Sequence, residues 1–142
     1  MKPQIRRSKS SDNPLEKQEG MALTSWVRSH YPEALFAHVA NEGQERKIAE
    51  GLVPGYPDYT LDEARGGYFG LRIELKRRKG GKLSDNQKDI AVKLLNNGYV
   101  WTACRGFPEA KAIIQWYMSM SKTVPLNVNP ESEIPITSLS HN

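Results

Sequence analysis

The sequence has one cysteine among its 142 residues, so an intramolecular disulfide is excluded. Its three histidines, His30, His38 and His141, lack the spacing of zinc ligands, and a zinc site is not expected. No stretch approaches the roughly 20 apolar residues that span a bilayer, and no apolar run follows the basic N-terminus. Neither a membrane segment nor a secretory signal is therefore predicted. Cys104 lies in an apolar run that is typical of a buried strand, where a core role is favoured over a nucleophilic one.

Length and charge indicate one domain with one core, flanked by polar ends. The net charge is +4, but its distribution is uneven. Residues 71–82 hold six Lys or Arg and one Glu, whereas residues 21–70 hold four Lys or Arg and seven Asp or Glu. From residue 123 onward there is no Lys or Arg, and three prolines stand among polar residues. We expect a disordered basic arm over 1–12, a domain over 13–122 and a disordered tail over 123–142.

Hydrophobic periodicity predicts alternating helices and strands. Ser84 and Gln87 match a capping box at the start of one helix, which is expected to turn Ile90, Ala91, Leu94 and Leu95 inward. The order of elements predicts an α/β sandwich, with a central mixed sheet flanked by helices on both faces. The expected elements are a helix over 13–30, a strand over 35–39, a helix over 44–52, a hairpin over 58–76, a helix over 84–97, a strand over 100–104 and a helix from 108.

The hairpin brings two acidic residues together. In residues 71–76 apolar and polar side chains alternate, as in a strand with one face in the core, and Glu74 and Lys76 share the polar face. A glycine pair at 66–67 suits a hairpin turn, and a hairpin centred there places Asp58 opposite Glu74. Facing carboxylates repel each other, and a bound divalent cation removes that repulsion. The pattern therefore predicts a metal site with a lysine beside it.

This trio suits the hydrolysis of phosphodiester bonds. Carboxylate oxygens select hard cations such as Mg²⁺ or Mn²⁺. Such a cation polarises a phosphoryl group and lowers the pKa of its bound water. Lys76 is placed to orient or deprotonate that water, or to neutralise charge on the phosphate. The competing interpretation is an ordinary solvated strand face.

Pro57-Asp58 followed by Glu74-Leu75-Lys76 resembles the motif of the PD-(D/E)XK nuclease superfamily. The resemblance implies a restriction-endonuclease-like core in which Asp58, Glu74 and the carbonyl of Leu75 bind Mg²⁺ or Mn²⁺, Lys76 assists the water and Gln87 lies near the site. Five motifs in order, over roughly residues 14 to 120, are similar to the virus-type replication-repair nuclease (VRR-NUC) domain: Gly55 to Asp58, Gly70 to Lys76, Gly80 to Ser84, Gln87 and Gly98-Tyr99.

Two upstream features extend the resemblance. His38 to Gly43 is similar to the family's H-x-P-N-E-G element, with Ala40 where proline is usual. The family also tends to carry a glutamate on its first helix, ten residues before an aromatic, and Glu16 stands at that distance from Trp26. Glu19 lies on the same helical stripe, and the alternative interpretation of either residue is a first-turn acid favoured by the helix dipole.

The positive segment beside Glu74 is expected to contact DNA phosphates, although an exposed turn would show the same composition. The candidate contacts are Arg72, Arg77, Arg78, Lys79 and Lys82.

Taken together, the resemblance implies a metal-dependent DNA endonuclease that acts on branched, junction or flap DNA in phage-type replication or repair. It implies a homodimer, since a symmetric junction needs paired cuts, and a location in the bacterial cytoplasm if a phage encodes the protein. Two alternatives stay open. One is a non-cleaving nucleic-acid-binding module, and the other is a restriction-type duplex endonuclease, for which little chain is left to form a recognition subdomain.

Overall fold

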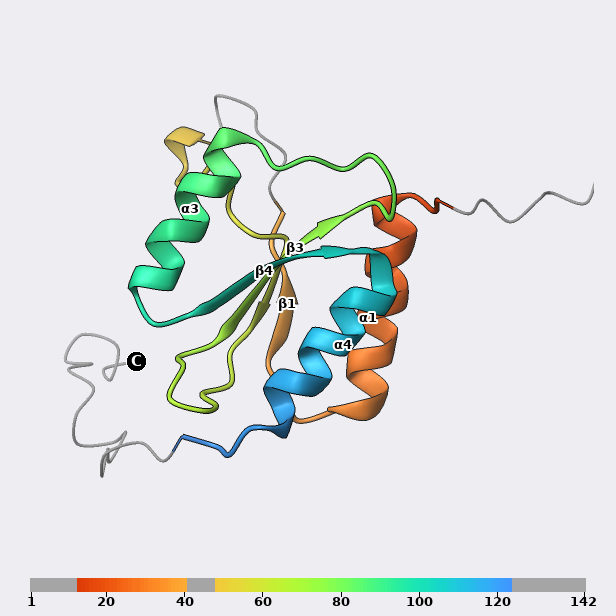
Figure 1. The fold of residues 1–142 in the computed structure, drawn as a ribbon, viewed down its shortest axis with the longest axis vertical. Coiled ribbons are helices and arrows are strands. Elements are labelled where there is room, and N and C mark those ends of the chain that lie inside the picture. Colours follow the sequence, from red (N-terminus) through yellow and green to blue (C-terminus); the bar gives the residue numbers. More distant parts are fainter. Residues whose placement is uncertain (1–12, 41–47, 124–142) are drawn as a thin grey trace, which may run out of the picture.

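The computed structural model describes residues 13–40 and 48–123. One mixed sheet has the strand order β1-β2-β3-β4, in which β1–β2 and β2–β3 are antiparallel and β3–β4 is parallel (Figure 1). The predicted α/β architecture is confirmed. The elements are α1 (Glu16–His30), β1 (Phe36–His38), β2 (Tyr59–Leu61), β3 (Leu71–Lys76), α3 (Asp85–Asn96), β4 (Val100–Arg105) and α4 (Gly106–Ser119).

Helices cover both faces of the sheet, with α3 on one side and α1 and α4 on the other (Figure 1). The core lies on the α1–α4 side, because the apolar side chains of β3 point there. Leu71, Ile73 and Leu75 are at most 2% exposed and pack with Leu23 of α1 and Ile114 of α4. The period-two pattern of β3 thus fixes which strand face meets these two helices.

The start of α3 follows the predicted capping box. The Ser84 hydroxyl accepts a hydrogen bond from the backbone N–H of Gln87 at 3.2 Å, and the Gln87 side-chain oxygen accepts one from the backbone N–H of Ser84 at 2.9 Å. The expectation for Leu95 was wrong, since its side chain is 53% exposed whereas Ala91 is buried. The reason is that α3 packs mainly against one strand, β4, so that its contact face is narrow.

Some expectations fall partly outside the described residues. Of the helix expected over 44–52, Ile48 and Ala49 are helical, and residues 41–47 lie outside, as do the arm at 1–12 and the tail beyond 123. In the described ranges no helix is long and apolar enough to cross a bilayer. Cys104 is 2% exposed in β4, and burial raises the pKa of its thiol to about 12, so it is a core residue.

Candidate active site

The register of the β2–β3 hairpin sets Asp58 against Glu74. Tyr59 pairs with Ile73, so the next antiparallel pair along the ladder is Asp58 and Glu74, as the sequence predicts. The Asp58 Oδ2 atom accepts a hydrogen bond of 2.7 Å from the backbone N–H of Leu75. This bond holds the Asp58 carboxylate across the hairpin, toward the end of β3.

Glu74 is a buried carboxylate with only one of its two oxygens satisfied. Its side chain is 4% exposed, and Oε1 accepts a 2.7 Å hydrogen bond from Gln87 Nε2. Lys76 Nζ lies 3.7 Å from the same oxygen. The other oxygen, Oε2, is buried and has no hydrogen-bond partner within residues 13–40 and 48–123. Because a buried acceptor without a partner is costly, Oε2 is a ready position for a cation.

The electrostatics of Glu74 point the same way. Burial, and then the negative charge of Asp58, raise the pKa of Glu74 to about 8, while the charge of Lys76 acts in the opposite direction. The closeness of the Asp58 carboxyl group and the charge of Glu16 contribute further increases. The Asp58 and Glu74 carboxyl groups therefore repel each other, and a positive charge between them would relieve that repulsion.

The donor set suits a hard divalent cation. Among the residues that the structure describes, no three or more His, Cys, Asp or Glu side chains form a metal-binding group. The candidate side-chain ligands are the carboxylates of Asp58 and Glu74, and the remaining positions would fall to a backbone carbonyl, to water or to substrate. Mg²⁺ commonly binds in this way, through one or two carboxylates together with water and phosphate.

The two carboxylates lie at an open cleft of about 1050 Å³. The cleft is lined by α1, by His38 at the end of β1 and by Tyr59 of β2. Gln87 and Lys76 border the cleft beside the carboxylates. An opening of this size lets an extended substrate reach the half-buried Asp58 and the buried Glu74.

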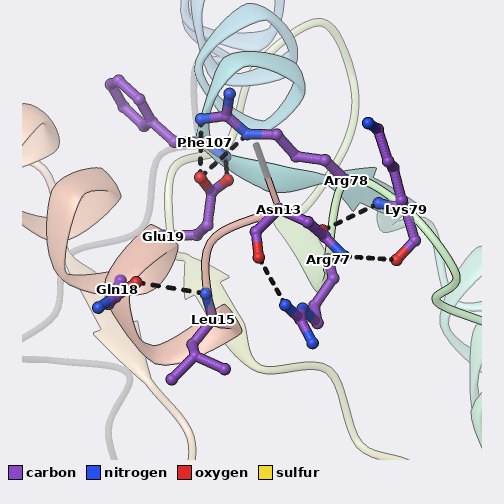
Figure 2. A network of polar contacts seen from close by, with 8 residues as sticks. All are labelled: Asn13, Leu15, Gln18, Glu19, Arg77, Arg78, Lys79 and Phe107. Carbon is purple, nitrogen blue, oxygen red and sulfur yellow. Dashed lines mark hydrogen bonds and ion pairs between the residues drawn. The ribbon is translucent and has the colours of Figure 1, made fainter. Parts of the chain in front are cut away.

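The structure separates the two glutamates that the sequence leaves undecided. Glu16 is exposed, lines the cleft and contributes to the field at Glu74. Glu19 is 3% exposed and faces elsewhere (Figure 2). Its carboxylate accepts hydrogen bonds from Arg78 Nε at 3.1 Å, from Arg78 Nη2 at 2.7 Å and from the backbone N–H of Phe107. Glu16 is thus the one near the site, while Glu19 joins α1 to the start of α4.

Arg72 does not lie where the sequence interpretation placed it, on a DNA-facing surface. Arg72 is 7% exposed. Its guanidinium group forms an ion pair with Asp62 at 3.1 Å and stacks 4.4 Å from the centre of the Tyr99 ring. The strand pattern gives the correct sheet face for Arg72, but not the aromatic ring that covers it. Arg72 is therefore not available to contact DNA.

The turn after β3 is also more engaged than expected, because it holds the start of the described chain (Figure 2). Arg77 Nη2 donates to the carbonyl oxygen of Asn13 at 2.5 Å, and the Asn13 side chain bonds both the N–H and the C=O of Lys79, each at 3.1 Å. Arg78 is paired with Glu19. Of the five candidate contacts, Lys79 and Lys82 have exposed side chains that form no ion pair within the described ranges.

Sequence reasoning missed the wall that α1 contributes to the cleft. The sequence signal for this wall is four residues of α1 spaced four, three and four positions apart, because this spacing places their side chains on one helical face. The residues are Lys17, Met21, Thr24 and Arg28.

Neither a protein-family model nor a curated protein matches this chain. Solved structures do match it. One, described as a VRR_NUC domain protein, aligns with a TM-score of 0.69 and 25% sequence identity, over 75% of this chain and 90% of that chain. This match supports the VRR-NUC family. It agrees with the motif order read from the sequence and indicates a nuclease domain, which implies contact with DNA.

Proposed function

We propose that this VRR-NUC-like protein is a Mg²⁺- or Mn²⁺-dependent DNA endonuclease. The observation that carries the proposal is the half-buried Asp58 beside the buried Glu74 at an open cleft, with Glu74 Oε2 lacking a partner among the described residues and Lys76 alongside. A non-cleaving binding module has no use for two opposed carboxylates, because they weaken the hairpin and repel phosphate.

The chain supplies an oriented set of oxygen ligands. Asp58 is held by the N–H of Leu75, and Glu74 by the side-chain amide of Gln87. The carbonyl of Leu75 is the proposed third ligand. When bound, the cation polarises the phosphoryl group and lowers the pKa of a bound water. The remaining steps belong to the side chains, which must hold these ligands fixed and manage charge around them.

Lys76 and Gln87 have the supporting roles in this proposal. The Lys76 side chain is 15% exposed and faces the cleft, where its ammonium group neutralises charge on the phosphate or orients the attacking water. Gln87 uses its oxygen to cap α3 and its nitrogen to orient Glu74. The capping and active-site interpretations of Gln87 are thus compatible, because they use different atoms of one side chain.

We further propose a branched, junction or flap DNA substrate and a homodimer with two active sites. The open cleft supports a structure-specific substrate, because it leaves room for DNA that departs from a regular duplex. Exposed apolar side chains on and beside α3 are the candidate surface for the second copy, namely Phe69, Val92 and Leu95. Light scattering of the purified protein, with and without Leu95→Glu, tests the dimer.

The test of function is a panel of labelled four-way junction, flap, linear duplex and single-stranded DNA, incubated with Mg²⁺, Mn²⁺ or EDTA. We expect metal-dependent cutting, fastest on a branched substrate, and a loss of at least about 100-fold in Asp58→Asn and Glu74→Gln. Both replacements conserve size, so they remove charge with little change in packing. Cutting that survives in EDTA contradicts the metal mechanism, and binding without cutting on every substrate favours the non-cleaving module.

A further inference from the structure

One face of α1 presents positively charged side chains to the cleft. Lys17, Met21, Thr24 and Arg28 are spaced so that they project from the same side of the helix, and all four line the cleft that reaches Asp58 and Glu74. The apolar residues of α1, including Leu23 and Val27, point instead into the core. We call the four cleft-facing residues the α1 stripe.

Both cations of the α1 stripe are unneutralised. The side chains of Lys17 and Arg28 are exposed, and in the described part of the chain neither forms an ion pair. In contrast, Arg78 is bound to Glu19 and Arg72 to Asp62. Lys79 and Lys82 after β3 are also unpaired among the described residues, but they do not line the cleft. The unpaired positive charge that lines the cleft therefore comes from α1.

The arrangement of charge along the cleft is uneven. Glu16 lies at the N-terminal end of α1, where its charge is felt at Glu74, so this end belongs to the acidic centre. Lys17 follows at once, and Arg28 is eleven residues further along, or about 16 Å at the helical rise. One strand of DNA places a phosphate about every 3.4 Å along the axis, so this length spans four to five phosphates.

The α1 stripe is held firmly relative to the acidic centre. At Gly20 the helix approaches the sheet so closely that a Cβ atom would overlap the hydroxyl group of Tyr59. The same hydroxyl group shares a side-chain hydrogen bond with Thr24. Because Tyr59 is the residue after Asp58, the contact ties the position of the α1 stripe to that of the carboxylate pair.

We propose that the α1 stripe is the track for the phosphate backbone of the strand to be cut. The inference rests on the proposed function and extends it by assigning the strand a path, along the cleft between α1 and the β1–β2 edge of the sheet. Lys17 and Arg28 contact phosphates to one side of the scissile bond, and Met21, which is 66% exposed, lies against the sugars between them. The track is not specific for sequence, because it binds backbone rather than bases.

The test measures binding separately from cutting. In an Asp58→Asn background and in EDTA, the anisotropy of labelled duplex, flap and single-stranded DNA is followed over a series of salt concentrations. Lys17→Ala with Arg28→Ala is expected to weaken binding at least about tenfold and to lower the slope of log K against log salt by about 1.8 for duplex, since each phosphate contact contributes about 0.9. With Asp58 restored, the double variant is expected to raise KM for cleavage more than it lowers kcat.

The matched control is Lys93→Ala with Lys122→Ala, which removes the same charge from exposed positions that do not line the cleft. Circular dichroism confirms that both double variants are folded. If the two double variants bind DNA equally well, the track is wrong, although the wild type still cuts. If the wild type neither binds nor cuts any of these DNAs, the proposed function itself fails.

Discussion

Replacing Glu19 should destabilise the protein without disabling its chemistry, and replacing Glu16 should do the reverse. Glu19 is the only described link that joins α1, the turn after β3 and the first turn of α4 through one carboxylate (Figure 2). Glu16 is exposed on the same helix, three residues earlier, and faces the cleft. The two residues therefore form a natural pair of test and control.

The magnitude follows from what Glu19→Ala leaves behind. Breaking a fully buried ion pair costs about 3–5 kcal/mol, but the Arg78 side chain is 41% exposed and can return to water. The backbone N–H of Phe107 is left without its acceptor, which costs about 1–3 kcal/mol. We expect a loss of roughly 2–4 kcal/mol in the free energy of unfolding for Glu19→Ala. Glu19→Gln, which keeps an acceptor for the Phe107 N–H, should lose roughly half as much.

The assay is unfolding in urea, followed by tryptophan fluorescence and circular dichroism, with cleavage measured per folded molecule. Glu16→Ala should change the free energy of unfolding by less than about 1 kcal/mol, as for an exposed first-turn acid, but should reduce cleavage. Equal stability of Glu19→Ala and Glu16→Ala would refute the assignment of Glu19 to the scaffold. Normal cleavage by Glu16→Ala would remove Glu16 from the site.

Three further predictions concern the same region. Burial raises the pKa of Glu74 to about 8, so the folded metal-free protein holds the carboxyl proton of Glu74 more tightly than the unfolded chain does. The free energy of unfolding should therefore fall by roughly 3 kcal/mol between about pH 5 and about pH 8. Urea titrations should show this pH dependence in the wild type and a flatter one in Glu74→Gln. Gly106 has φ of +74° and an added Cβ would overlap Glu19, so Gly106→Ala should lower the melting temperature more than Gly67→Ala, which has φ of +86° in open space. Gln87→Glu retains an acceptor for the cap of α3 but brings a third carboxylate to Glu74. Cleavage should therefore fall, while the stability of the helix in urea changes little. Equal cleavage by this variant and the wild type would remove Gln87 from the site.

The features that sequence could predict are those set by local pattern. Alternation along β3 and the glycine pair at 66–67 are sufficient to bring Asp58 opposite Glu74, because strand period and turn position fix a register. The capping box likewise fixes where α3 starts, and hence where Gln87 lies. These are short-range rules, and they hold here because no tertiary contact overrides them.

The features that sequence could not predict depend on contacts between distant segments. Tyr99 covers Arg72 only because β4 pairs beside β3, which alternation within β3 does not encode. Glu16 and Glu19 lie about 60° apart around the helix, so a small rotation of α1 decides which one enters the cleft. That rotation is set by the approach of Gly20 to Tyr59, a contact that spans 39 positions of the chain.

The burial of the Cys104 thiol makes the native chain suitable for labelling at one introduced cysteine. Its thiol is 2% exposed, and its high pKa keeps it protonated at neutral pH, so maleimide dyes should not react with it in the folded state. A cysteine introduced at the exposed position of Met21 would then be the one reactive thiol in the described ranges. A fluorophore attached there could report the arrival of a DNA strand in real time, with no need to remove a core residue first.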